Sequence, residues 1–192
     1  ANGERTMFPD NGANADLEAS DLPSLDDIDG VYLSGYALLD FRSRAAVLAM
    51  IKKIKVSGKP IFFDPTTTGA MKIVSRDEVL SWVALMDGIL LNSEEALYLG
   101  DATDVETAEE NLAQITPLVV IKLGSKGAMA INGSEKAKVS AVTTNVVDTT
   151  GAGDSFAAGF IPKWLETSDL TQALSAGAAL AAKCVSSVGA RP

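Results

Sequence analysis

The segment Asp148–Phe156 carries the residues best suited to chemistry, in the order Asp-Thr-Thr-Gly-Ala-Gly-Asp-Ser-Phe. Gly151 and Gly153 let the backbone turn tightly and approach a ligand closely. The segment runs into a predicted helix, and the free N–H groups of a first helical turn attract an anion, because the positive end of the helix dipole lies behind them. The pattern therefore predicts an anion-binding turn.

Asp154, at the start of that helix, has two interpretations. Its carboxylate is either a partner of the helix dipole, worth roughly 0.3–1 kcal/mol, or a general base beside the bound anion. The sequence contains no histidine, which excludes Ser-His-Asp and Cys-His pairs, histidine-based zinc sites and proton transfer by imidazole. Carboxylates, lysine, tyrosine and the single thiol remain as candidate bases.

Polar residues also follow the predicted strands, and they are Ser34-Gly35, Asp64, Asn92 with Glu95, Gly124 and Asp148. Taken singly, each is better explained as a helix cap or a turn former. Open α/β sheets, however, bind ligands at the carboxyl ends of their strands. Together these residues therefore predict a ligand-binding edge.

The elements that would position these residues alternate between strands and helices, as expected of βαβ units around a mostly parallel sheet. Apolar or β-branched runs predict strands at 31–33, 61–63, 89–91 and 118–123. Helices are predicted over 42–57, 75–86, from 94 with Ser93 as its cap, and over 104–114, 152–166 and 169–187. An Asn-Gly-Ser turn between the runs 127–131 and 136–142 predicts an antiparallel hairpin. The fold class is α/β.

Composition limits the function classes. The 192 residues, 47% of them apolar, predict one domain that buries one sizeable core or at most two small ones. A net charge of −9 argues against nucleic acid or an anionic membrane as a partner, and no apolar run is long enough to span a bilayer. Cys184 alone cannot form a disulfide within the chain, which fits a reducing compartment. We therefore expect a soluble, cytoplasmic protein.

Two familiar phosphate-binding motifs are absent. Gly124–Gly127 lacks the spacing of a P-loop and leads into a strand, and Gly151–Gly153 is not followed by the third glycine of a dinucleotide fingerprint. An acidic protein that binds a polyphosphate then depends on local devices such as backbone dipoles and a metal ion.

The segment from Asp148 to Phe156, with Gly159-Phe160 after it, closely resembles the carboxyl-terminal signature of the ribokinase (PfkB) family of carbohydrate kinases. Asn92–Glu95 resembles the family's Asn-x-x-Glu motif, and Lys122–Gly127 resembles its Gly-x-x-Gly turn. The resemblance extends along nearly the whole chain. It implies a ribokinase-like three-layer α/β/α sandwich with a mostly parallel sheet.

The resemblance also implies a small β lid that is incomplete in this chain. Residues 1–12, with a predicted strand at Arg5–Phe8, would be its remnant, and residues 13–192 would form the nucleotide-binding catalytic core. Lid strands mediate dimers in the family, which implies a homodimer contact at Arg5–Phe8.

The function implied is ATP-dependent phosphorylation of a carbohydrate hydroxyl. Asp154 would be the general base that removes the hydroxyl proton, and Gly151, Ala152 and Gly153 would form the anion hole. The partners implied are therefore a small sugar substrate and ATP.

Further residues are implied in nucleotide and ion binding. The nucleotide positions would be Asn92, Glu95, Lys122, Gly124, Gly127, Asp148, Thr150 and Gly177. Mg²⁺ would be contacted through water by Asn92 and Glu95, since magnesium usually keeps several waters. Asp148, with backbone near Cys184 and Gly189, would hold a monovalent cation such as K⁺.

Departures from the family pattern leave alternatives open. Asp64–Thr68 lacks the Asn and Arg that often follow this Asp, Gly177 stands where His or Asn is frequent, and Lys122 replaces a frequent Thr. The family's first strands and most of its sugar-binding residues have no counterpart here, so the sugar is not specified. A vitamin-precursor or nucleoside kinase, or a non-catalytic nucleotide-binding or dimerisation module, remain alternatives.

Overall fold

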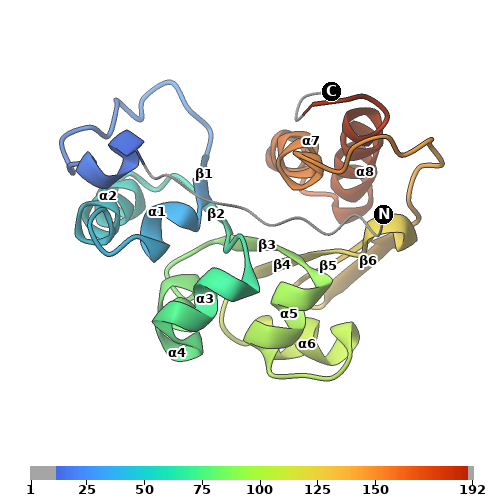
Figure 1. The fold of residues 1–192 in the computed structure, drawn as a ribbon, viewed down its shortest axis with the longest axis horizontal. Helices are drawn as coiled ribbons and strands as arrows, with labels where there is room; N and C mark the ends of the chain where they lie inside the picture. The colour runs from blue at the N-terminus through green and yellow to red at the C-terminus, as the bar shows by residue number, and fades with distance from the viewer. Residues whose placement is uncertain (1–11, 190–192) are drawn as a thin grey trace.

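The computed structural model describes residues 12–189, shown in Figure 1. The strand predicted at Arg5–Phe8 and the dimer contact expected there lie outside the described residues. Gly12 begins a short 3-10 helix, η1 (Gly12–Asp16). The division into a lid and a core therefore stays a prediction.

Within the described residues, six strands form one sheet in chain order from β1 to β6. They are β1 (Val31–Ser34), β2 (Ile61–Asp64), β3 (Gly88–Asn92), β4 (Leu118–Lys122), β5 (Ala128–Asn132) and β6 (Glu135–Val139). The first four pair in parallel, and β5 is antiparallel to both of its neighbours. The predicted mostly parallel sheet with an added hairpin is confirmed, although β6 ends at Val139 rather than at 142.

Helices cover both faces of this sheet (Figure 1). One face carries α1 (Tyr36–Leu39), α2 (Arg44–Ser57), α3 (Thr68–Val74), α4 (Arg76–Val83), α5 (Ser93–Gly100) and α6 (Val105–Leu112). The other carries α7 (Ala152–Thr167) and α8 (Leu170–Val185). The expected three-layer sandwich is confirmed. The helices α1 and α3 were not predicted from the sequence, because each is too short to show a helical apolar stripe.

The sheet separates two hydrophobic cores, since alternate residues of a strand face opposite sides. Phe63 and Leu91 pack with α1 to α6. Phe62 and Leu90 pack against α7 and α8, whose contribution includes Phe156. Burial on both faces explains why the inner strands are continuous apolar runs rather than alternating ones.

The same alternation decides which polar side chains meet at the carboxyl edge of the sheet. Asp64, Asn92 and Lys122 each lie two residues beyond a strand residue that packs against α7 and α8. Asn92 is directly opposite Lys122 in the parallel register. These three side chains therefore belong to the face on which α7 begins.

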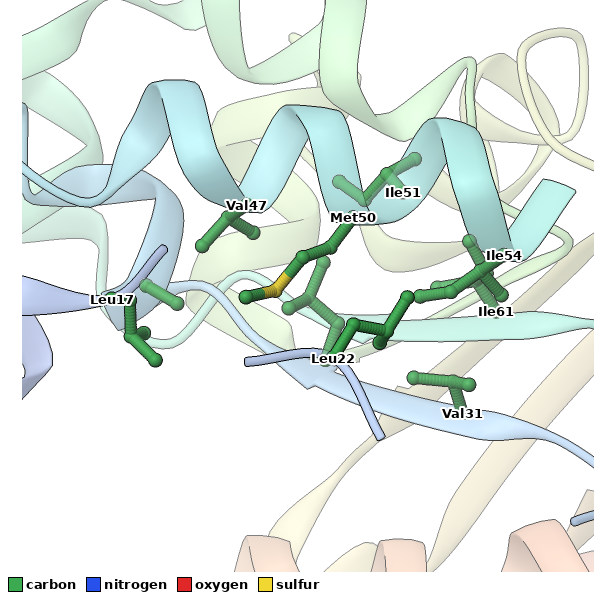
Figure 2. A pocket seen from close by; sticks show the side chains of 10 residues that line it. Leu17, Leu22, Val31, Val47, Met50, Ile51, Ile54 and Ile61 are labelled. Carbon is green, nitrogen blue, oxygen red and sulfur yellow. The ribbon is translucent and has the colours of Figure 1, made fainter. Parts of the chain in front are cut away.

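An apolar cavity of about 140 Å³ lies on the opposite face, between α2 and strands β1 and β2 (Figure 2). Its lining consists of Leu17, Leu22, Val31, Leu33, Ala37, Val47, Met50, Ile51, Ile54 and Ile61. Such a lining offers a charged or polar ligand no hydrogen bonds, so burying one there is unfavourable. The cavity is separate from the polar edge.

Candidate active site

The predicted anion-binding turn forms at the start of α7. Gly151 precedes the helix with φ at 75°, a left-handed conformation that glycine adopts without strain. The Thr150 amide donates to Asp148 Oδ1 at 2.8 Å, and the Ser155 amide donates to the Gly151 carbonyl at 2.9 Å. A bond from the Ala152 amide to the Thr149 carbonyl at 3.3 Å also fixes the turn. The first amides of α7 have no partner one turn earlier in their own helix.

Asp154 lies in the first turn of α7 with an exposed side chain. Its Oδ1 accepts a hydrogen bond from the Tyr32 hydroxyl of β1 at 3.2 Å. Over residues 12–189, Asp154 takes part in no ion pair. The carboxylate therefore reaches from α7 to the sheet, where a solvent-borne substrate can meet it.

A lysine–aspartate pair lies next to the glycine turn. Lys122 Nζ, from the end of β4, donates to Asp64 Oδ2 at 2.7 Å, and the two side chains are only 15% and 11% exposed. A Cβ atom built at Gly153 would lie 3.4 Å from the same Nζ. The turn therefore combines main-chain amides with a positive charge, as binding of an anion requires. Asp64 and Lys122 were predicted separately, as residues of the sheet edge and of the nucleotide site, and their pairing was not predicted.

Asn92 and Glu95 form a capping box at the start of α5. Asn92 Oδ1 accepts from the Glu95 amide at 2.9 Å, while the Glu95 carboxyl accepts from the Asn92 amide at 2.8 Å and from its Nδ2 at 2.6 Å. The prediction that Ser93 caps this helix is wrong, because Asn92 is the capping residue and Ser93 is the first helical residue. These hydrogen bonds therefore hold the junction between the end of β3 and the start of α5.

Glu95 is buried in this capping box. Burial, reinforced by the neighbouring carboxylate of Asp64, raises the pKa of Glu95 to about 7. The hydrogen bond from the Asn92 amide and the charge of Lys122 act in the opposite direction. Glu95 thus shares one electrostatic environment with the Lys122–Asp64 pair.

The predicted Gly-x-x-Gly turn follows β4 as a short 3-10 helix, η2 (Gly124–Lys126). Gly124 and Gly127 have φ values of 60° and 97°, which favour glycine. A side chain at Gly127 would also collide with the backbone of Val139 in β6. Turn geometry accounts for both glycines, and their contact with nucleotide phosphates stays a prediction.

Asp148 meets the end of α8, as the resemblance implied. Asp148 Oδ2 accepts from the Gly189 amide at 3.3 Å, and the Val147 amide donates to the Val185 carbonyl at 2.7 Å. Cys184 is buried, and its thiol donates to the Thr150 carbonyl at 3.4 Å. The structure therefore gathers the residues expected around a monovalent cation, while the cation itself stays a prediction.

Gly177 has a packing role in the structure. It is buried in α8, where an added Cβ would lie 3.0 Å from the ring and the carbonyl oxygen of Phe156 in α7. The two helices approach this closely only because the residue is glycine. The nucleotide contact predicted for Gly177 is not needed to explain it.

Tyr32 is the residue at this edge that sequence reasoning missed. It belongs to no motif, and its tie to Asp154 spans 122 positions. The available signal was a tyrosine in a strand whose other face is apolar, which marks a side chain directed at a polar neighbour.

Comparisons with known proteins agree with the resemblance found in the sequence. The family model described as pfkB family carbohydrate kinase matches residues 1–192. An uncharacterized sugar kinase from Archaeoglobus fulgidus is 29% identical over 193 residues, covering 98% of this chain and 74% of the relative. Ribokinase from Arabidopsis thaliana is 30% identical over 203 residues, covering 100% of this chain and 51% of the relative.

Solved structures agree with the sequence relatives. A Vibrio cholerae fructokinase with bound fructose, ADP and calcium has a TM-score of 0.81 at 27% identity, covering 91% of this chain and 60% of that one. A Salmonella enterica aminoimidazole riboside kinase has a TM-score of 0.83 at 25% identity, covering 95% and 65%.

The fold and the edge define a ribokinase-type α/β protein. More specifically, the chain belongs to the pfkB family of carbohydrate kinases. It spans 74% of the length of the Archaeoglobus relative. It spans about half the length of the other curated relatives, for example 51% of the Arabidopsis ribokinase. Among the described residues, no helix is both long and apolar enough to cross a membrane.

Proposed function

We propose that the protein transfers the γ-phosphoryl group of ATP to a hydroxyl of a sugar or a related compound. The observation that carries this proposal is the exposed Asp154 carboxylate beside a glycine turn and the ammonium of Lys122. Family membership supports the reaction class, since the relatives are named as kinases of sugars and ribosides.

Asp154 is the proposed general base. It accepts the proton of the acceptor hydroxyl while that oxygen bonds to the γ-phosphorus, and the bond from phosphorus to the bridging oxygen breaks to release ADP. Phosphoryl transfer asks a protein mainly for in-line positioning and for stabilisation of charge. A fixed carboxylate at the open edge meets the first demand.

The anion hole of Gly151, Ala152 and Gly153 meets the second demand, together with Lys122. The first amides of α7 and the helix dipole favour the negative charge of the transferring group. Asp64 holds Lys122 Nζ at 2.7 Å, beside Gly153, so the ammonium needs no rearrangement when charge develops. Lys122 thus supplies a positive charge at a position where the family often has threonine.

Magnesium fits this edge through water. Both carboxyl oxygens of Glu95 already accept hydrogen bonds from Asn92, and residues 12–189 contain no cluster of three or more acidic, histidine or cysteine side chains suited to a metal. Mg²⁺ bound to the phosphates neutralises part of their charge. Asn92 and Glu95 would then orient its waters rather than ligate it.

For a monovalent cation, the proposed site is the loop of Asp148 at the end of α8. A carboxylate and the carbonyl groups of a helix C-terminus both favour positive charge. Replacing KCl by a tetramethylammonium salt is expected to weaken binding of an ATP analogue if K⁺ occupies this loop.

The central test is Asp154→Ala, with Asp77→Ala as the matched control. Both aspartates are exposed in the first turn of a helix, so each loses the same dipole interaction. We expect Asp154→Ala to lower kcat by roughly 10²–10⁴-fold, as for loss of a general base, with nucleotide binding retained. Asp77→Ala is expected to retain full activity. Unchanged turnover in Asp154→Ala would show that this carboxylate only stabilises its helix.

The acceptor class needs its own experiment. The relatives include a fructokinase and an aminoimidazole riboside kinase, so both free sugars and nucleosides are candidate acceptors. Release of ADP is to be measured with a panel of hexoses, sugar acids, ribosides and vitamin-precursor alcohols. Binding of ATP without turnover of any acceptor would instead favour a nucleotide-binding module.

A further inference from the structure

Tyr32 of β1 holds the side chain that the proposed reaction uses as its base. Its hydroxyl donates to Asp154 Oδ1 at 3.2 Å. Among residues 12–189, the Asp154 side chain makes no other hydrogen bond. In particular, it accepts none from the amides of its own helix. The sheet, rather than α7, therefore sets the direction of the carboxylate.

The surroundings of Tyr32 keep its hydroxyl protonated. Partial burial raises the pKa of the phenol, and the carboxylates of Asp64, Asp154 and Glu95 raise it further. A phenol in this environment remains a donor at neutral pH and is unsuited to act as a base itself. The cation at this edge, Lys122, is paired with Asp64 and lies beside Gly153.

From this geometry we infer that Tyr32 is a positioning residue for the general base, an inference that rests on the proposed function. An exposed aspartate samples several rotamers, and restricting it to the reactive one removes an entropy loss from the catalytic step. The Tyr32 hydroxyl provides that restriction by fixing Oδ1. Oδ2 is then the oxygen that receives the proton of the acceptor.

The same contact separates the two substrates in space. Tyr32 comes from β1, at one edge of the sheet, whereas Lys122 comes from β4, beyond β2 and β3. Lys122 and the glycine turn mark the side of Asp154 that takes the phosphoryl group. The acceptor alcohol therefore approaches from the β1 side, next to the Tyr32 ring, which is 39% exposed.

The test is Tyr32→Phe, which removes the hydroxyl and retains the ring. Loss of one hydrogen bond to the base is expected to lower kcat by roughly 3- to 10-fold, with the KM for ATP and the Kd of a non-hydrolysable ATP analogue unchanged. Tyr36→Phe is the matched control, because Tyr36 is also exposed and lies four positions away. It is expected to behave as wild type.

Coupling between the two residues separates positioning from a general structural effect. In the Asp154→Ala background, Tyr32→Phe is expected to cause no further loss of rate, since nothing remains to be positioned. A further loss by the same factor, or a weaker affinity for the ATP analogue, would overturn the inference. Thermal unfolding is expected to be unchanged, because the buried part of the ring is kept.

The two proposals fail in different ways. If Asp154→Ala turns over normally, the proposed function fails and the role of Tyr32 fails with it. If Asp154→Ala is inactive but Tyr32→Phe has the kcat of wild type, only the positioning role is overturned.

Discussion

Two lysines of the same sheet meet carboxylates in different surroundings. Lys122 on β4 contacts Asp64 at 2.7 Å, and both side chains are largely buried at the carboxyl edge. Lys136 on β6 contacts Glu110 at 2.8 Å and Glu109 at 3.7 Å, with the lysine 47% exposed. The first pair lies beside the glycine turn of α7, whereas the second joins the outer strand to α6.

The difference in burial decides which of the two ion pairs can be explained by its contribution to stability alone. An exposed pair such as Lys136–Glu110 contributes little to stability, because water and salt screen it. A buried pair such as Lys122–Asp64 loses much of its Coulombic gain to desolvation, so it adds little stability compared with apolar residues of the same size. A buried ammonium next to helix amides is better explained by the anion that it would bind.

Among variants of the two lysine–carboxylate pairs, the largest effect is expected from removing the charge of Lys122. Lys122→Met should lower kcat by roughly 10²–10³-fold, as for loss of one group that stabilises charge in the transition state. Lys136→Met, the matched variant on β6, should keep the kcat of wild type. Steady-state kinetics measure both variants, and an equal loss of activity in the two would show that the buried position of Lys122 gives it no special role.

The control for folding is the double variant Asp64→Asn/Lys122→Met. Lys122→Met alone leaves the Asp64 carboxylate buried without its partner, a change that destabilises by about 3–5 kcal/mol. Neutralising Asp64 as well should restore much of that stability, which chemical denaturation would measure. Activity should stay low in the double variant, and its recovery would show that the ammonium is needed only to offset Asp64.

A medium effect is expected from crowding the anion hole. In Gly153→Val the Cβ would lie 3.4 Å from Lys122 Nζ, and the branched methyl groups would intrude on the space for phosphate oxygens. We expect the Kd of a non-hydrolysable ATP analogue to rise by roughly tenfold, or about 1.4 kcal/mol. Calorimetric titration measures it, and an unchanged Kd would place the phosphates elsewhere.

The matched glycine lies in the hairpin near Lys136. Gly133 has φ at 60° with no atom near an added Cβ, and asparagine tolerates this left-handed conformation. Gly133→Asn should therefore leave nucleotide affinity unchanged. A loss of affinity there as well would indicate a general response of the fold to glycine replacement.

The fold was predictable from the sequence where local pattern decides structure. Buried parallel strands are continuous apolar runs, and the longer amphipathic helices show a 3.6-residue stripe. The helices α1 and α3 were missed because one or two turns carry too few apolar positions. Residue type alone favours Ser93 as the cap, but the reciprocal bonds of Asn92 and Glu95 place the cap one residue earlier.

The site was predictable where it lies in one segment. The glycine turn and Asp154 are contiguous, so their chemistry follows from residue order. The Lys122–Asp64 and Tyr32–Asp154 contacts span 58 and 122 positions, and they depend on which side of each strand faces α7. A one-residue change of register would turn these side chains to the opposite face, so only the folded sheet determines them.

The smallest effect, a change in stability, is expected from Glu109→Leu beside Lys136. Burial raises the pKa of Glu109, against the opposing charge of Lys136, and its Oε1 is buried without a hydrogen-bond partner among the described residues. Because the folded state holds this proton more tightly than the unfolded state, the contribution of Glu109 to stability falls as pH rises above its ordinary value of 4.5.

Replacing Glu109 by leucine removes that pH dependence, and the free energy of unfolding at pH 8 should increase by up to about 1 kcal/mol. The gain over wild type should shrink as the pH is lowered to 4.5, which urea unfolding at several pH values measures. Binding of the ATP analogue should not change. A variant that is less stable at pH 8 would show instead that the attraction between Lys136 and Glu109 outweighs the cost of burying the Glu109 carboxylate. The ion pairs of Lys122 and Lys136 would then stabilise the fold in the same way.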